Sequence, residues 1–123
     1  MRINEVVTQA ELDEVERFAD ELWGKLGVDV EFTRHFLDRV NDERNEKPIS
    51  KGELIRLFSK SFEKYGDKIA DAAGLQGVLT DLLTKINLPF VINDPGPGRD
   101  TDMVAKTVMR KDNFQTSNPR FRI

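Results

Sequence analysis

The chain has 123 residues, which is room for one domain rather than two. It contains no cysteine and one histidine, which excludes disulfides, cysteine nucleophiles and metal sites built from several histidines. The formal net charge of −3 argues against a general binder of polyanions. No apolar run approaches the about 20 residues that span a membrane, and no apolar stretch follows Arg2 as in a signal peptide. We therefore expect a protein of a reducing compartment, with no membrane partner.

Charge is distributed unevenly along the chain. Between Met1 and Gly24, seven acidic residues accompany two basic ones, whereas between Met103 and Ile123 five basic residues accompany one acidic residue. This pattern predicts a polarised surface. In one interpretation the two ends attract each other within the fold, and in the other the basic end binds phosphate.

The N-terminal quarter predicts a helix followed by a strand. Thr8 and Glu11 form a capping-box pattern. Apolar residues then recur at steps of three and four, as in an amphipathic helix that ends near Gly27. In the segment 28–32, apolar and charged residues alternate strictly, which predicts a short strand with one buried face.

A short second helix is expected after this strand. Thr33 is placed to cap it, and Phe36 lies on its apolar side. The helix fades in a polar run and must end before Pro48, because the residue before a proline avoids the helical conformation.

A longer third helix begins at another capping box. Ser50 and Glu53 form the box, and the apolar stripe after it predicts a helix that stops at Gly66. Residues 67–83 are ambiguous because two glycines interrupt them, with a short helix over 78–83 as one interpretation.

The last third of the chain changes character and indicates a sheet. Residues 88–92 and 103–110 predict a hairpin, with Pro89 near a strand start or on an edge and a Pro/Gly-rich loop over 93–101. Residues 121–123 offer a short additional strand. We therefore expect an α+β fold in which N-terminal helices pack on a small antiparallel sheet, a hairpin plus one or two short strands.

His35 is the residue around which candidate chemistry gathers. If Thr33 is the cap, His35 lies in the first helical turn, where free backbone N–H groups and the helix dipole favour an anion and keep the imidazole neutral. Arg39 lies four residues further on the same face, so a phosphate there would meet both side chains. In the competing interpretation His35 packs beside Phe36, and Arg39 pairs with a nearby carboxylate.

A metal site is an alternative for the same helix. Glu31, His35, Asp38 and Asp42 have rough helical spacing and offer carboxylate oxygens with one imidazole. The alternation over 28–32 places Glu31 on the strand, however, and acids at this spacing usually form a solvated face. We therefore expect no metal and no cofactor.

Two cations stand close together on the second strand of the predicted hairpin. Alternation places Lys106 and Arg110 on one face and Thr107 on the other. Such a pair requires an acidic partner or an anion. Carboxylates from the helices satisfy it in one interpretation, and phosphate, with bidentate contacts from Arg110, satisfies it in the other.

Two parts of the chain resemble a known family. The helical part carries an H-x-x-x-R element, His-Phe-Leu-Asp-Arg at 35–39, followed by Arg44 and the segment 49–54. The strand part consists of residues 88–92 and 104–111. Together they resemble the phage-encoded branch of the barnase–EndoU–colicin–RelE-like nucleases, which pairs such helices with an antiparallel sheet.

The resemblance implies a metal-independent ribonuclease in which the ribose 2′-hydroxyl attacks the adjacent phosphate. The histidine would act as acid or base, and the basic side chains would hold the phosphate and stabilise the transition state. A second acid–base group would have to be Glu, Lys or Tyr. The residues implied are His35, Arg39, Lys106 and Arg110 for catalysis, and Arg44 and Lys111 for substrate binding.

The resemblance covers roughly residues 28–123, which leaves 1–27 as an added N-terminal helix of a single domain, 1–123. Two functions from different classes follow. The first is RNA binding or cleavage. The second is a non-catalytic phage protein, a virion component or a binder of a host protein, whose acidic helix over Thr8–Leu26 docks on a basic partner or on itself. The expected location is the host cytoplasm or the virion, without secretion.

Overall fold

The structure is a computed structural model that describes residues 7–94, 96–98 and 100–123. Arg2 and Glu5 of the acidic start, and Pro95 and Arg99 of the loop predicted over 93–101, lie outside the described residues. Within the described part, no helix is long and apolar enough to cross a membrane. The elements in chain order are α1 (Gln9–Gly24), β1 (Val28–Phe32), α2 (Phe36–Val40), the 3-10 turn η2 (Glu43–Asn45), α3 (Lys51–Ala70), β2 (Gln76–Asp81), β3 (Ile86–Asn93), β4 (Thr101–Ala105), β5 (Met109–Arg110) and β6 (Arg120–Arg122).

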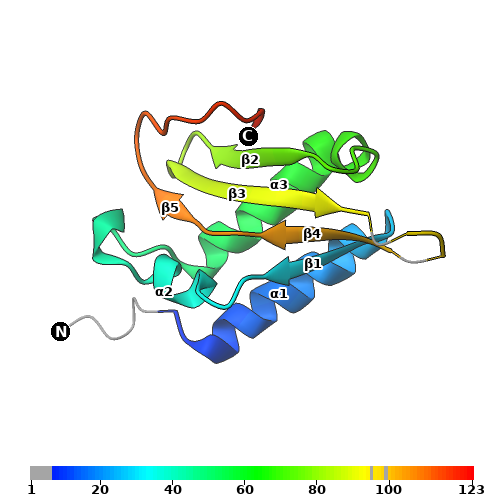
Figure 1. Ribbon diagram of the computed structural model, residues 1–123. Coiled ribbons are helices and arrows are strands. Elements are labelled where there is room, and N and C mark those ends of the chain that lie inside the picture. Colours follow the sequence, from blue (N-terminus) through cyan, green and yellow to red (C-terminus); the bar gives the residue numbers. More distant parts are fainter. Residues whose placement is uncertain (1–6, 95, 99) are drawn as a thin grey trace.

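The strands form one mixed sheet, and Figure 1 shows α3 crossing behind it while α1 runs along β1. The strand order is β1-β4-β3-β2-β6, and β5 pairs with β3. The predicted hairpin of β3 and β4 is confirmed, as are the strand over 28–32 and the α+β class. The purely antiparallel sheet is wrong, because β1 runs parallel to β4 and β6 runs parallel to β2. The two strands of each pair are distant in the chain. No tight hairpin turn joins them, and so nothing forces them to run antiparallel.

Both long helices begin at the predicted capping boxes, which start at Thr8 and Ser50. The predicted stop of the third helix at Gly66 is wrong, since α3 continues to Ala70. A Cβ added at Gly66 would lie 3.0 Å from the side chain of Leu26. This glycine therefore serves the close packing of α3 against the segment that follows α1, and not the termination of the helix.

Carboxylates of α1 cover the free edge of β1. Asp20 Oδ1 accepts a hydrogen bond from the Val30 N–H at 2.9 Å, and Glu16 Oε2 accepts one from the Phe32 N–H at 2.8 Å. Unpaired N–H groups on an edge strand invite pairing with another chain. Part of the acidic character of α1 is thus explained by a structural task, which is to close this edge of the sheet.

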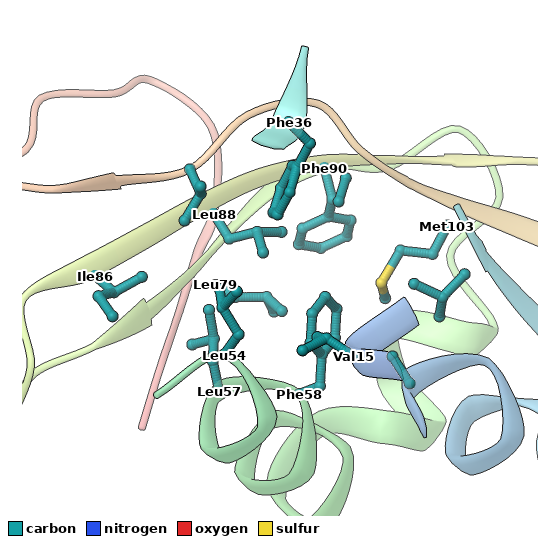
Figure 2. Close-up of a cluster of buried hydrophobic side chains, with 14 of the residues drawn as sticks. Val15, Phe36, Leu54, Leu57, Phe58, Leu79, Ile86, Leu88, Phe90 and Met103 are labelled. Carbon is teal, nitrogen blue, oxygen red and sulfur yellow. The ribbon is translucent and has the colours of Figure 1, made fainter. Parts of the chain in front are cut away.

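The core fills the space between the sheet and the two long helices. Figure 2 shows the side chains of α3 facing those of β2 and β3, with Phe36 reaching in from α2. Phe36 is fully buried and stacks on Phe32, with ring centroids 4.3 Å apart. This ring anchors the short helix α2, and the residue before it, His35, remains at the surface with 74% of its side chain exposed.

Two of the predicted local structures are wrong. Residues 78–83 form the end of β2 and a turn instead of a helix, and β2 is buried at five consecutive positions, as expected of a strand inside a sheet. Thr33 does not cap α2, because its hydroxyl donates to the carbonyl of Lys106 at 2.8 Å. His35 occupies the cap position and makes no side-chain capping bond.

The strand predicted over 103–110 is interrupted opposite Pro89. Three residues, 106–108, separate β4 from β5, whereas only two residues of β3 face them. Pro89 lies inside β3, so the prediction that it stands near a strand start or on an edge is wrong. Proline has no backbone N–H to donate to a neighbouring strand, and the bulge in the facing strand leaves no ladder hydrogen bond that would require one. The extra residue reverses the alternation. Arg110 therefore turns to the helix side of the sheet and no longer shares a face with Lys106.

Candidate functional site

A cleft with a volume of about 1040 Å³ lies where α2, η2, the bulge after β4 and β5 come together. Figure 1 shows α2 and β5 at the same end of the sheet. All site residues expected from the sequence line this cleft, namely His35, Arg39, Arg44, Lys106, Arg110 and Lys111. Thr107, which the uninterrupted strand placed on the other face, also lines it because of the bulge.

The cleft is basic although the whole chain is acidic. Six Lys and Arg side chains line it together with three carboxylates, Asp42, Glu46 and Asp112. The cation that sequence reasoning missed is Lys85, which lies in the turn between β2 and β3. The interpretation of residues 78–83 as a helix concealed this turn, and Glu46 carried no sequence signal at all.

Lys106 and Lys111 are the most available cations of the cleft. Both are exposed, and neither side chain has an ion-pair or hydrogen-bond partner within the residues that the structure describes. Lys85, by contrast, lies 3.8 Å from a carboxylate oxygen of Asp112. An exposed lysine without a partner binds an anion without first breaking an internal contact.

The two arginines on the α2 side share one carboxylate. Arg44 donates from Nη2 to Asp42 at 2.8 Å, and Arg39 Nη1 lies 3.7 Å from the same carboxylate. Hydrogen bonds from the Arg44 side chain and from its backbone N–H lower the pKa of Asp42 to about 2. Asp42 therefore stays ionised and partly neutralises Arg44, while the longer contact leaves Arg39 more free to meet a ligand.

His35 lies at the surface of the cleft and does not pack in the core. Its Nδ1 is 3.8 Å from a carboxylate oxygen of Asp38, and both side chains are well exposed. This is the neighbourhood of an accessible imidazole, able to exchange protons with a ligand. The helix that follows, α2, has only five residues. The anion site expected at its first turn therefore lacks the dipole of a long helix.

Arg110 is fully engaged inside the protein. Two of its guanidinium N–H groups donate to the Glu53 carboxylate at 3.0 and 2.7 Å, and the others donate to the carbonyls of Lys47, Pro48 and Thr84 at 3.0, 2.8 and 2.7 Å. All five donors of the guanidinium are thereby used, and 11% of the side chain is exposed. The expected phosphate contact from Arg110 finds no free N–H group. Its place in the structure is to join α3, the segment before it and the β2–β3 turn into one wall of the cleft.

The carboxylate partner of Arg110 is ionised as a result. Burial alone would raise the pKa of Glu53, but hydrogen bonds from Arg110 and from Ser50 outweigh it and hold this pKa below its ordinary value. A similar pair, Arg56 with the buried Asp81, holds the other side of the β2–β3 turn, with Nε to Oδ2 at 2.8 Å. The interpretation in which a helix carboxylate satisfies the strand cations thus holds for Arg110.

Acidic residues gather at the other end of β4. Asp29 of β1 pairs in register with Asp102 of β4, and Glu31 follows on the same face of β1. Burial, and then the neighbouring carboxylates, raise the pKa of both Asp29 and Glu31. Within the described residues, no ion pair joins the acids of α1 to the basic C-terminal segment, and Glu14 of α1 pairs with Lys51 of α3. The attraction between the two ends of the chain that one interpretation expected thus involves no direct ion pair among the described residues.

The metal alternative is not assembled in the fold. Glu31 lies on β1, and Asp42 is held by Arg44. In the part of the chain that the structure describes, no group of three or more His, Asp or Glu side chains is arranged to hold a metal ion.

Comparison with known proteins assigns no family. A scan against protein-family models, a search of curated proteins and a search of solved structures each find no match. The resemblance to the phage-encoded nucleases stays a prediction that rests on the sequence elements alone.

Proposed function

We propose that this protein binds RNA by holding its phosphates in the basic cleft. The observation that carries the proposal is convergence: six cations from five separate segments of an acidic chain line one cleft. Lys and Arg contacts to phosphate supply most of the sequence-independent affinity for nucleic acids. A cleft that concentrates positive charge also focuses the field and draws an anionic chain toward it.

The expected contacts divide between the two walls of the cleft. Lys106 and Lys111, unpaired within the described residues, contact phosphates from the sheet side, and Arg39 contacts a phosphate from the α2 side. Thr33 and Thr107 also line the cleft. The acidic surface at the far end of β4 repels phosphate, so the bound strand lies across the α2–β5 end of the molecule.

RNA, and not DNA, is favoured by the resemblance to the nuclease family, whose chemistry uses the ribose 2′-hydroxyl. His35 is accessible and lines the same cleft, so it is the residue placed to transfer a proton if the bound strand is cleaved. The proposal for binding does not depend on cleavage.

Binding is tested with a fluorescent single-stranded RNA at two salt concentrations. Each neutralised phosphate contributes about −0.7 to the slope of log K against log salt for a single strand. Replacing both Lys106 and Lys111 by alanine should weaken binding and make this slope shallower by about 1.4. The matched control replaces Lys25 and Lys68, which are also exposed but lie outside the cleft lining, and should change the slope little.

The same experiment can overturn the proposal. Equal loss in the cleft variant and in the control would show that the contacts are diffuse. Absence of RNA binding at low salt would favour the rival function, a non-catalytic phage protein whose acidic helix over Thr8–Leu26 docks on a basic partner or on itself. A single-stranded DNA of the same sequence tests the preference for RNA.

Cleavage is tested separately with end-labelled RNA in EDTA. If His35 transfers a proton, His35→Ala should abolish cleavage while binding persists, because the phosphate contacts are assigned to Lys106, Lys111 and Arg39. Cleavage that survives this substitution would remove His35 from the chemistry.

A further inference from the structure

Glu46 stands at the centre of a strained turn in the cleft wall. Its backbone has φ 62° and ψ −55°, and the Lys47 N–H donates to the carbonyl of Asn45 at 2.6 Å. This is a γ-turn with positive φ, a rare and strained conformation for a residue with a side chain. Such strain persists only where the surrounding structure imposes it, and it is frequent at functional sites.

The turn is clamped on both sides. Asn45 is buried, its Nδ2 donates to the carbonyls of Arg39 and Val40 at 2.9 and 3.2 Å, and its Oδ1 accepts from the backbone N–H of Arg110 at 2.9 Å. On the other side, the guanidinium of Arg110 holds the carbonyl of Lys47 at 3.0 Å. The residue between these anchors is thus presented to the cleft in a fixed position.

The carboxylate of Glu46 has no partner among the described residues. It is exposed and lines the cleft, yet it forms no ion pair or side-chain hydrogen bond, whereas Asp42 pairs with Arg44 and Asp112 lies near Lys85. An unpaired carboxylate repels phosphate, so phosphate binding alone does not account for it. An ionised carboxylate accepts hydrogen bonds and never donates them, so its partner on the ligand is an N–H or O–H donor.

In single-stranded RNA such donors are the ribose 2′-hydroxyl, which every nucleotide carries, and the N–H groups of the bases, whose edges are open to side chains and differ from base to base. Cytosine presents an amino group where uracil presents a carbonyl oxygen, and Glu or Asp is the acceptor that suits the cytosine amino group. We infer that Glu46 accepts a hydrogen bond from the exocyclic amino group of a bound base and so selects cytosine over uracil. This inference rests on the proposed binding of RNA in the cleft and adds a specificity-determining residue to it.

The test compares oligo(C) with oligo(U), each about ten nucleotides long, at neutral pH and low salt. The wild-type protein should bind oligo(C) about tenfold more tightly, the order of one good side-chain contact to a base edge. Glu46→Gln should bring this ratio close to one, because an amide can donate to the uracil oxygen as well as accept from the cytosine amino group. Glu43→Gln is the matched control, since it removes the same charge from an exposed position outside the cleft lining.

The ratio, and not the affinity, is the readout, because both substitutions remove a negative charge and strengthen binding to any RNA. The control should keep the tenfold ratio. Replacing Lys106 and Lys111 by alanine should weaken both ligands equally, which separates phosphate contacts from base selection. Equal binding of oligo(C) and oligo(U) by the wild type, or an unchanged ratio in Glu46→Gln, would overturn the inference and leave the proposed function standing. Failure of both oligomers to bind at low salt would overturn the two together.

Discussion

Replacing Arg110 by methionine should be among the most damaging single substitutions in this protein. The side chain crosslinks α3, the segment before it and the β2–β3 turn through five hydrogen bonds. Methionine fills a similar volume but donates nothing. The substitution leaves Glu53, whose side chain is 20% exposed, without its cation, and three carbonyl groups without their donors.

The magnitude follows from burial. Removing one partner of a buried ion pair costs about 3–5 kcal/mol, and the remaining exposure of Glu53 places this pair near the lower end, at about 3 kcal/mol. The three carbonyls lie close enough to the surface to recover water, and together they add about 1 kcal/mol. We therefore expect a loss of about 4 kcal/mol in the free energy of unfolding. For a chain of this length that loss corresponds to about 15 °C in Tm.

Urea unfolding followed by circular dichroism measures this loss, with Arg44→Met as control. Arg44 also pairs with a carboxylate, but 77% of its side chain is exposed, so the control should remain close to wild type. The depressed pKa of Glu53 adds a pH signature: its stabilisation is present above its ordinary pKa of 4.5 and is lost as pH falls through the folded-state value. The difference between wild type and Arg110→Met should therefore narrow below about pH 4. A variant as stable as Arg44→Met, or a difference independent of pH, would refute the assignment of Arg110 as the structural anchor of the cleft.

Two further substitutions test the packing and the electrostatics of the sheet. A Cβ added at Gly77 would lie 2.9 Å from ring atoms of both Phe90 and Phe121, so Gly77→Ala should cost about 1–3 kcal/mol in chemical denaturation, and an unchanged midpoint would show that the rings yield freely. Asp102→Asn should stabilise the protein by about 0.5 kcal/mol at pH 7, because Asp102 lies opposite Asp29 and helps to raise the pKa of that carboxyl. A carboxyl with a raised pKa destabilises the fold once pH exceeds the pKa of the same group in the unfolded chain, so the gain should vanish near pH 3 and shrink in high salt. A gain that persists at pH 3 would contradict the electrostatic explanation.

The predictions confirmed most closely are those in which a few neighbouring residues suffice to define the structure. The capping boxes at Thr8 and Ser50 join residues three positions apart, so their residue types define the helix starts wherever the helices pack. The alternation over 28–32 likewise marks β1, because the two faces of a strand differ in burial. The six expected site residues also meet in one cleft, which the H-x-x-x-R spacing and the basic C-terminal segment indicated only in part.

The sequence by itself determined where the long helices and β1 begin, and that the C-terminal segment carries the available positive charge. Only the tertiary structure decided what each charged side chain does. A bulge opposite Pro89 turns the Arg110 side chain away from Lys106. Arg110 then pairs with the carboxylate of Glu53, which lies 57 residues away in the chain. The exposed Glu46 receives its fixed place from the same arginine. Such roles escape sequence reasoning because an ion pair or a clamped turn depends on which distant segments the topology brings together, and local periodicity carries no record of that.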